Sequence, residues 1–306
     1  MSAASGGPRP LAGRRALVTG GGRGVGAAIT LALAADGADV AITYVRDEEK
    51  AAATVAAVAA LGVRCRAYRG SVAEPEDNRA LVEAVVADFG GLDLLVSNAG
   101  IASRGRTVAA TDAAELEKVL RVHALGPHEL CRLALPHLRH APRSDIVFIS
   151  SVAASRFMPG GAPYAMGKAA AEALAHTIAR EERAAGVHVN IVAPGLVDTE
   201  MGARLVRATT GLDDIRAMDA ASPFGHVCSP GEVAEAVLFL VTSGYVHDQR
   251  ITVDGGTFWR DRTRPPRRPA AGGDREAARR GAGLHRRGTG RGPVRSALRL
   301  VARRLG

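Results

Sequence analysis

Short apolar segments alternate with helical segments along most of this chain, and the alternation restricts the fold more than any other feature. A stretch of helical periodicity separates each predicted strand from the next. The predicted strands are Ala16–Thr19, Val40–Tyr44, Arg64–Tyr68, Leu92–Val96, Asp145–Ile149, Val187–Val192 and Arg250–Val253. The predicted helices are Val25–Asp36, Asp47–Leu61, Glu74–Phe89, Asp112–His137, Tyr164–Ala185 and Glu232–Val241. This order predicts an α/β fold: a doubly wound parallel sheet of about seven strands with helices on both faces.

The composition suits an aliphatic core. Hydrophobic residues make up 47% of the chain but aromatic residues only 4%, so Ala, Val, Leu and Ile must fill the interior. Strands that are buried on both faces of a parallel sheet have this character. Cys65, Cys131 and Cys228 are odd in number and far apart, which argues against a disulfide framework or a zinc site. Reduced thiols in a cytosolic protein are the better interpretation.

The positive charge of the chain is concentrated near its C-terminus. The net charge is +9, but residues 261–306 contain 14 arginines against three acidic residues, a balance of +11, which leaves −2 for residues 1–260. The tail is rich in Arg, Gly, Pro and Ala and has too little apolar surface to offset the entropy of ordering. We therefore expect a flexible N-terminus at 1–10, one folded domain at 11–260 and a disordered basic tail at 261–306.

The tail leaves two interpretations open, and the rest of the chain predicts a location. A basic tail can bind nucleic-acid phosphates without sequence preference, but a solvated extension without function is the interpretation we favour. The N-terminal segment lacks the apolar run of a signal peptide. No stretch of about 18 uninterrupted apolar residues exists, so the sequence predicts no membrane span and a cytoplasmic protein.

A glycine-rich segment follows the first predicted strand and opens the first predicted helix. Its sequence, Thr19-Gly-Gly-Gly-Arg-Gly-Val-Gly26, puts glycines at positions 20, 24 and 26. Glycines let the backbone turn tightly and approach a pyrophosphate, which the helix N-terminus also attracts. An ordinary glycine-rich turn is the alternative, but the strand–turn–helix context favours a dinucleotide cofactor and a Rossmann-type sheet.

A tyrosine, a lysine and a serine form the second motif. Tyr164 and Lys168 are four residues apart, so they share one face of a predicted helix. A nearby ammonium lowers the pKa of a phenol from about 10, and a proton donor works best near the ambient pH. Ser151 ends the fifth strand, where its hydroxyl can bond the same substrate oxygen. A solvated helix face and a turn serine, for which Ser150 serves equally well, are the plainer alternatives.

Together these residues resemble the pattern of the short-chain dehydrogenase/reductase family, and the likeness covers about residues 11–260. Ser97-Asn-Ala-Gly100, the Pro194-Gly195 segment and Ile251-Thr-Val-Asp-Gly-Gly256 are similar to further motifs of that family. The resemblance implies an NADP-binding catalytic domain in which Ser151, Tyr164 and Lys168 are catalytic. It implies that the following residues border the cofactor: Gly20, Arg23, Gly24, Val25, Gly26, Tyr44, Arg46, Ser71, Asn98, Ala99, Gly100, Tyr164, Lys168, Pro194, Gly195, Val197 and Thr199.

The residues after the second strand predict NADP(H) rather than NAD(H). An acidic residue there would bond the ribose hydroxyl of NAD and repel a 2′-phosphate, but the position is Tyr44, followed by Arg46. Arg23 adds a second guanidinium, and arginine pairs well with phosphate. The alternative is that Arg46 begins a solvated helix and Arg23 stacks on adenine with either cofactor. Asp47 weakens the preference.

Two positions depart from the family pattern. His123 stands where the family has an asparagine that holds a water of the proton relay. A histidine titrates near neutrality and could relay protons, or it could be a packing substitution, and these alternatives stay open. Ser71 replaces an aspartate that contacts adenine, and its hydroxyl is a weaker substitute.

The resemblance implies an oxidoreductase that transfers hydride between NADPH and a ketone or secondary alcohol. The 3-oxoacyl-acyl-carrier-protein reductases and polyketide ketoreductases are the most similar group, so a substrate linked to a carrier protein or CoA is the candidate. The family also implies a homo-oligomer, a tetramer or dimer that packs helices 112–137 and 164–185. Rival interpretations are a catalytically impaired NADP-binding scaffold or sensor and a nucleic-acid binder acting through the tail.

Residues 199–226 are expected to form a mobile lid over the substrate. Its apolar side chains could line a pocket or could simply be the buried faces of amphipathic helices. These residues are Met201, Leu205, Val206, Leu212, Met218 and Phe224.

Overall fold

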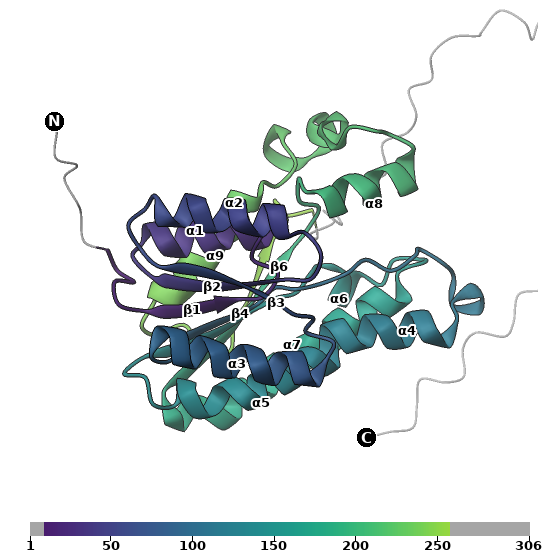
Figure 1. Ribbon diagram of the computed structural model, residues 1–306. Coiled ribbons are helices and arrows are strands. Elements are labelled where there is room, and N and C mark those ends of the chain that lie inside the picture. The colour runs from purple at the N-terminus through teal and green to yellow at the C-terminus, as the bar shows by residue number, and fades with distance from the viewer. Residues whose placement is uncertain (1–8, 258–306) are drawn as a thin grey trace, which may run out of the picture. The chain divides into compact units, whose positions relative to one another are not determined.

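Seven parallel strands form the centre of the computed structural model, which describes residues 9–257 (Figure 1). They are β1 (Arg15–Val18), β2 (Asp39–Tyr44), β3 (Cys65–Arg69), β4 (Leu94–Ser97), β5 (Ser144–Ile149), β6 (Val187–Pro194) and β7 (Arg250–Val253). Their order is β3-β2-β1-β4-β5-β6-β7, and every pair is parallel. The predicted doubly wound parallel sheet is confirmed.

Alternate side chains of a strand pack into the hydrophobic clusters on opposite faces of the sheet. Both sets are buried, which explains why the strand sequences are continuous apolar runs. In β1, Ala16 and Val18 pack into one hydrophobic cluster and Leu17 into the other. Successive side chains of a strand point to opposite faces. A strand that is covered on both faces therefore has no solvent-facing position for a polar residue.

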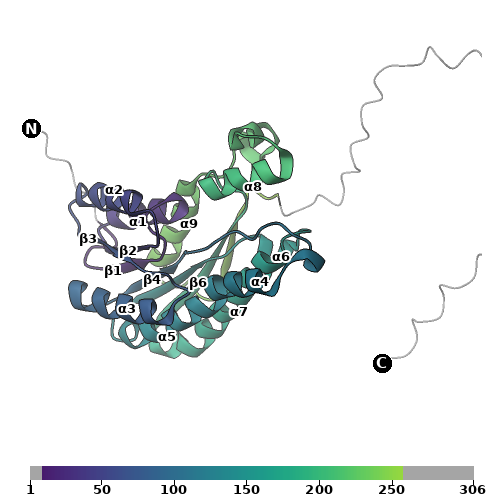
Figure 2. The same ribbon diagram turned by 45° about the vertical axis from the view of Figure 1, so that its right-hand side comes forward.

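Helices cover both faces of the sheet, as Figures 1 and 2 show. On one face, α1 (Gly24–Ala35), α2 (Glu48–Ala59) and α9 (Pro230–Thr242) contribute Leu33, Val58 and Val237 to the core. The other face is covered by three helices, α3 (Pro75–Phe89), α5 (Gly126–Leu138) and α7 (Ala162–Glu182). The remaining helical segments are α4 (Ala113–Leu120), α6 (Ala153–Arg156), α8 (Glu200–Thr210), η1 (Val108–Ala110), η2 (Arg121–Leu125), η3 (Arg183–Ala185), η4 (Ile215–Ala221) and η5 (Pro223–Gly225).

The predicted helix 112–137 is interrupted. It consists of α4, a π-helical turn at η2 and α5, and His123 lies inside the π turn. A π turn inserts one extra residue into a helix and turns the side chains around it, and such turns are common at functional sites. The expectation of one regular helix was wrong in this respect, because hydrophobic periodicity over a long window does not resolve a single extra residue.

The segment expected as a lid contains one amphipathic helix and two short turns. In this segment Val206 packs with Ile215 and Val227 in a small cluster of its own, whereas Leu205 and Phe224 are exposed. Helix α8 begins with a side-chain cap, in which Thr199 Oγ1 accepts a hydrogen bond from the Gly202 amide at 3.1 Å. The interpretation as helix faces therefore holds for Val206, and the exposed side chains remain free to meet a substrate.

The described residues belong to the first of two units of the chain, residues 1–260 and 261–306. The predicted flexible N-terminus at 1–10 lies outside the described residues except for its last two positions. The predicted basic tail at 261–306 lies wholly outside them. None of the helices between residues 9 and 257 is long and apolar enough to cross a membrane.

The order of the strands reverses between β1 and β4, which both continue into loops at their carboxyl ends. In open sheets of this kind, ligands bind beyond these ends at the point of reversal. At the opposite, amino edge, ion pairs fasten the sheet: Arg15 Nε lies 2.7 Å from a carboxylate oxygen of Asp93, and Arg14 Nη2 lies 2.8 Å from one of Asp145. Ion pairs thus stabilise the amino edge of the sheet, and the carboxyl edge is where a ligand is expected.

Gly26 shows how tightly the chain turns at the carboxyl end of β1. A Cβ atom at this position would lie 2.1 Å from the Gly20 carbonyl oxygen and 2.6 Å from Asn98 Nδ2, both closer than any real contact. We therefore predict that Gly26→Ala lowers the free energy of unfolding by about 2 kcal/mol, since the backbone must shift. Urea denaturation followed by circular dichroism measures the change.

Gly231→Ala is the matched control for this substitution. Gly231 lies in the first turn of α9, and its added Cβ atom would meet only Ser229 Oγ, at 3.7 Å. This variant should match or slightly exceed the stability of the wild type, because alanine favours a helix. Equal losses in both variants would show that the crowding at Gly26 is not the cause.

Candidate active site

The glycine loop at the carboxyl end of β1 is fixed to the loop that follows β4. Asn98 Nδ2 donates a hydrogen bond to the Thr19 carbonyl oxygen at 2.8 Å, and Thr19 Oγ1 accepts from the amides of Asn98 and Ala99, both at 3.0 Å. The Gly20 amide donates to Thr43 Oγ1 at 2.9 Å. These bonds join the ends of β1, β2 and β4, so the predicted cofactor residues Asn98, Ala99 and Gly20 lie together.

The first turn of α1 is suited to bind an anion. Arg23 is its N-cap, but the side chain makes no capping hydrogen bond, and the first turn contains no acidic residue. The initial amides of a helix have no partner within the helix and carry positive partial charge. Gly24 adopts a positive φ of 52° and, like Gly26, has no side chain that could block an approaching group. A dinucleotide pyrophosphate fits this uncapped, glycine-lined turn.

The segment after β6 reaches back to the glycine loop. The Gly195 amide donates to the Val253 carbonyl oxygen at 2.9 Å, and Val197 pairs with Cys228 in an isolated bridge. A Cβ atom on Gly24 would lie 3.3 Å from Thr199 Cγ2. Pro194, the last residue of β6, accepts a hydrogen bond from the Val152 amide at 2.9 Å. Of the cofactor residues predicted on this segment, Thr199 therefore lies against the glycine loop.

Ser151 and Tyr164 meet beyond the carboxyl end of β5. Ser151 follows this strand, and Tyr164 lies in the first turn of α7, where the Ser151 side chain is close enough to influence the pKa of the phenol. Burial raises the pKa of the Tyr164 phenol above its ordinary value, and Ser151 opposes this shift only in part. The phenol is therefore protonated at neutral pH.

Lys168 lies one helical turn from Tyr164, as predicted, but the pKa of the Tyr164 phenol is raised rather than lowered from its ordinary value. Its Nζ atom is 5.8 Å from the centre of the Tyr164 ring and donates a hydrogen bond to the Ile149 carbonyl oxygen at 2.6 Å. Burial lowers the pKa of Lys168 itself to about 8, against a smaller opposing effect of Glu172. The expectation of an acidified phenol was wrong because burial, the largest influence on the pKa of Tyr164, favours the neutral form of the phenol.

Ser150 has a structural role that separates it from Ser151. Its hydroxyl donates to Glu172 Oε1 at 2.6 Å, and Arg250 Nε donates to the same oxygen at 2.8 Å. Arg250 also contacts the Ser151 carbonyl oxygen at 3.3 Å. This cluster fixes the end of β5 from behind. Sequence reasoning missed Glu172, although its position one helical turn after Lys168 indicated which face of α7 it occupies.

His123 is buried next to Tyr164. The two rings meet edge to face, with centres 5.2 Å apart, and His123 Nε2 lies 2.8 Å from the Ile101 carbonyl oxygen. Cβ atoms on Gly100 and Gly167 would each come within 2.8 Å of the His123 side chain, so these two glycines provide its space. Burial, with a smaller contribution from the charge of Lys168, lowers the pKa of His123 to about 3.

This low pKa corrects one of the two interpretations of His123. A proton relay by an imidazole that titrates near neutrality was one of them, and it fails because the ring stays neutral until the solution is strongly acidic. The packing interpretation agrees with the burial of the ring and with its fit between the glycines.

The cations expected near a 2′-phosphate differ in their surroundings. Arg46 is exposed at the end of β2, beside half-buried Tyr44. Asp47 caps α2 by accepting a hydrogen bond from the Lys50 amide at 3.3 Å. Arg23 pairs with Glu200 at 3.2 Å. Sequence reasoning identified neither Lys50 nor Glu200 as part of this group.

Ser71 takes part in the loop that follows β3. Its hydroxyl accepts a hydrogen bond from the Ala73 amide at 3.3 Å, and its amide donates to Asp77 Oδ2 at 2.8 Å. The hydroxyl hydrogen of Ser71 is therefore the group left for an adenine contact.

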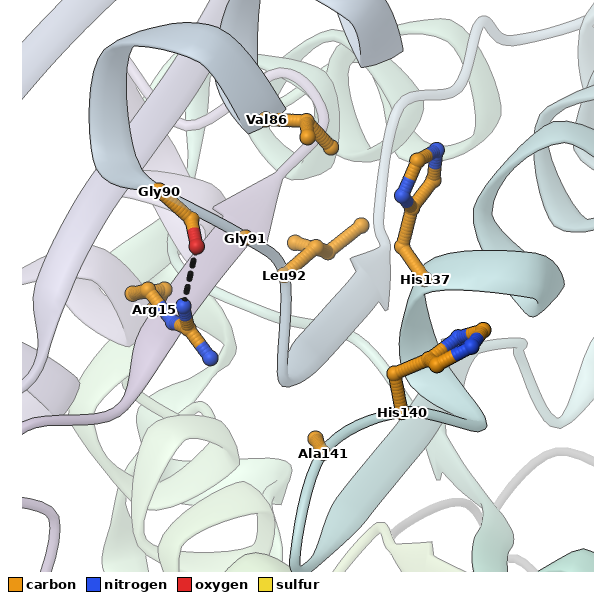
Figure 3. A pocket seen from close by; sticks show the side chains of 8 residues that line it. All are labelled: Arg15, Val86, Gly90, Gly91, Leu92, His137, His140 and Ala141. Carbon is orange, nitrogen blue, oxygen red and sulfur yellow. Dashed lines mark hydrogen bonds between the residues drawn. The ribbon is translucent and has the colours of Figure 1, made fainter.

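A cavity of about 270 Å³ lies at the amino edge of the sheet, away from these residues (Figure 3). It is lined by the start of β1 and the end of α5, including Arg15, His137 and His140. The guanidinium of Arg15 is already held by Asp93 and by the Gly90 carbonyl oxygen. This hollow therefore offers no free cation and is separate from the site around Tyr164.

The fold and the site define a dinucleotide-binding oxidoreductase, and comparison with known proteins agrees. A family model described as enoyl-(acyl carrier protein) reductase matches residues 20–257. The 3-oxoacyl-[acyl-carrier-protein] reductase FabG of Staphylococcus aureus is 33% identical over 249 residues, which cover 80% of this chain and 98% of that protein. The chain belongs to the short-chain dehydrogenase/reductase family.

Two solved structures illustrate the similarity. A short-chain dehydrogenase from Burkholderia cenocepacia in complex with NADP is 37% identical, with a TM-score of 0.73 over 80% of this chain and 98% of that one. An NAD⁺-bound xylitol dehydrogenase is 25% identical, with a TM-score of 0.75 over 80% of this chain and 99% of that one. Proteins similar to this chain therefore include structures with either nicotinamide cofactor.

The buried charge of Lys168 predicts a pH-dependent stability. The pKa is about 8 in the folded protein and 10.5 for a free side chain, so the unfolded chain binds more protons between these values. The free energy of unfolding of the wild type, relative to Lys168→Met, should rise by about 3 kcal/mol from pH 8 to pH 10.5. Urea denaturation of both proteins at several pH values measures it.

Lys118→Met is the control for this experiment, because Lys118 is exposed on α4. Its difference from the wild type should not vary with pH in the same window. A difference for Lys168→Met that stays constant from pH 8 to pH 10.5 would contradict the lowered pKa.

The neutral His123 ring predicts a loss of stability at acidic pH. The pKa is about 3 when folded and 6.5 for a free side chain, so stability contributed by the neutral ring is lost as the pH falls through this range. The wild type should lose about 3 kcal/mol relative to His123→Asn between pH 7 and pH 4. The same change at exposed His128 is the control and should show no such loss.

Proposed function

We propose that this protein catalyses the NADPH-dependent reduction of a ketone, with a 3-oxoacyl thioester or a polyketide-type ketone as its substrate. The observation that carries the proposal is the meeting of Ser151 and Tyr164 beyond the end of β5, with Lys168 one helical turn away. These two hydroxyls can bond one carbonyl oxygen at the same time.

Tyr164 is suited to give a proton in the reducing direction. Its pKa is raised by burial, so the phenol carries its proton throughout the physiological range. Ser151 donates a hydrogen bond to the substrate oxygen, and Tyr164 transfers its proton to that oxygen as negative charge develops there. A bound reduced nicotinamide supplies the hydride that the carbonyl carbon receives.

Lys168 acts at the stage when the proton leaves. Its pKa of about 8 keeps most of the side chain charged at neutral pH. The ammonium has little effect on the neutral phenol but attracts the phenolate that forms during proton transfer. An interaction that is stronger in the transition state than in the ground state accelerates the reaction.

The preference for NADPH is supported by the charges at the glycine loop and after β2. Arg23 precedes α1, Arg46 is exposed after β2, and Asp47, the first carboxylate after β2, caps a helix. A similar protein was crystallised with NADP and another with NAD⁺, so these charges carry the inference for this chain.

The substrate class is supported by the 33% identity to a 3-oxoacyl-[acyl-carrier-protein] reductase. Exposed Leu205 and Phe224 of the segment after β6 offer apolar surface that an acyl chain could cover. We further propose a cytoplasmic homo-oligomer that packs α4–α5 and α7. Leu125 and Met166, both large and exposed on these elements, support that surface.

Removal of one hydroxyl tests the mechanism. Tyr164→Phe should lower kcat for ketone reduction by at least about 100-fold, the usual contribution of a positioned proton donor, while the dissociation constant for NADPH changes little. The assay offers a panel of simple ketones and 3-oxoacyl thioesters with NADPH and with NADH, and it follows oxidation of the nicotinamide. Ser150→Ala, which alters the neighbouring hydroxyl, is the control and should retain more activity than Ser151→Ala.

The same panel of ketones distinguishes the proposed reductase from a catalytically impaired NADP-binding sensor. A catalytically impaired sensor would bind NADPH and reduce none of the ketones, and His123 in the place of the family's asparagine is the observation that favours it. Full activity of Tyr164→Phe would exclude the proposed role of the phenol.

A further inference from the structure

One carboxylate joins two cations beside the glycine loop. Glu200 Oε2 lies 3.2 Å from Arg23 Nη1, and Glu200 Oε1 forms an ion pair with Lys50 Nζ. All three side chains are about half exposed. They come from three separate elements: the glycine loop, the first turn of α2 and the first residue of α8.

Packing of the backbone brings the two cations to the same place. The first turns of α2 lie against the glycine loop, where a Cβ atom on Gly22 would come within 3.0 Å of Ala51 Cα. Thr54 Oγ1 also donates to the Gly22 carbonyl oxygen at 3.2 Å. Lys50 precedes Ala51, and Arg23 follows Gly22. The two cations are therefore close to each other beside the glycine loop.

We propose that Lys50 is part of the site for the cofactor's 2′-phosphate, together with Arg23, and that Glu200 is the internal counter-ion which this phosphate replaces. The inference rests on the proposed use of NADPH and adds to it the residues that set the selectivity. Lys50 and Glu200 are thus specificity-determining residues, with opposite effects on the discrimination between NADPH and NADH.

The charges explain why the exchange is possible. A single carboxylate faces two cations, and Lys50 has a second, longer contact with Asp47 at 3.4 Å. Exposed ion pairs contribute little free energy, so replacing Glu200 costs little. A phosphate brings up to two negative charges and accepts several charge-assisted hydrogen bonds, so it satisfies Arg23 and Lys50 better than one carboxylate does.

The exchange distinguishes the two cofactors. NADH has a hydroxyl where NADPH has the phosphate, so it cannot replace Glu200. Because Glu200 begins α8, binding of NADPH would also release the start of this helix from the glycine loop. NADH would leave that contact in place.

Fluorescence titration of the full-length protein with NADPH and with NADH tests the inference without a substrate. The readout is the ratio of the two dissociation constants, Kd for NADH over Kd for NADPH, at low ionic strength. Glu200→Gln should raise this ratio roughly fivefold, because it removes a negative charge next to the phosphate. Lys50→Gln should lower the ratio by a similar factor.

Matched variants separate this effect from a change of net charge. Glu181→Gln on α7 and Lys118→Gln on α4 alter the same charges at exposed positions in other elements, and each should leave the ratio unchanged. The effect of Glu200→Gln should shrink in the Lys50→Gln background, because one of its two partners is gone.

The titration results test the proposed function and the roles of Glu200 and Lys50 separately. If the wild type binds neither cofactor, or binds NADH more tightly than NADPH, the proposed function fails first. If the wild type prefers NADPH but Glu200→Gln leaves the ratio unchanged, or weakens both cofactors alike as a clasp would, the inference about Glu200 is overturned. An unchanged ratio for Lys50→Gln removes Lys50 from the phosphate site.

Discussion

The hydrogen bonds between Thr19 and Asn98 hold together the two strand ends at which the order of the sheet reverses. Through them the glycine loop keeps its turn, and the first turn of α1 has no capping side chain. The proposed catalytic residues depend on the same frame, because Ser151 follows the adjacent strand β5, and Tyr164 and Lys168 lie on α7, which covers one face of the sheet. The residues proposed for cofactor binding and for proton transfer therefore lie at one set of parallel strand ends.

The sequence predicted most of this frame, because its signals are local. The strand at β1, the glycines at 20, 24 and 26 and the spacing of Tyr164 and Lys168 each act through neighbours in the chain. The fold, and the family to which the chain belongs, follow from such patterns. The π turn at His123 was not predictable in this way, since a single extra residue hardly changes a hydrophobic pattern.

The electrostatics of the site lay beyond the sequence for a different reason. Spacing along a helix indicates that Tyr164 and Lys168 are neighbours, but not how far each is removed from water. Burial dominates the pKa values of Tyr164, Lys168 and His123, and it depends on side chains from several elements. The ion pairs of Glu200 escaped prediction likewise, because their partners are about 150 residues or more away in the chain.

The side chain of His123 fits between Gly100 and Gly167. The two glycines face different parts of this side chain. A Cβ atom on Gly100 would lie 2.8 Å from His123 Cε1, so the imidazole ring fits only while position 100 is glycine. A Cβ atom on Gly167 would lie 2.8 Å from His123 Cβ, an atom that every residue except glycine has, so position 167 must stay glycine whether a histidine or an asparagine stands at 123. The substitution of His123 is therefore linked to position 100 and independent of position 167.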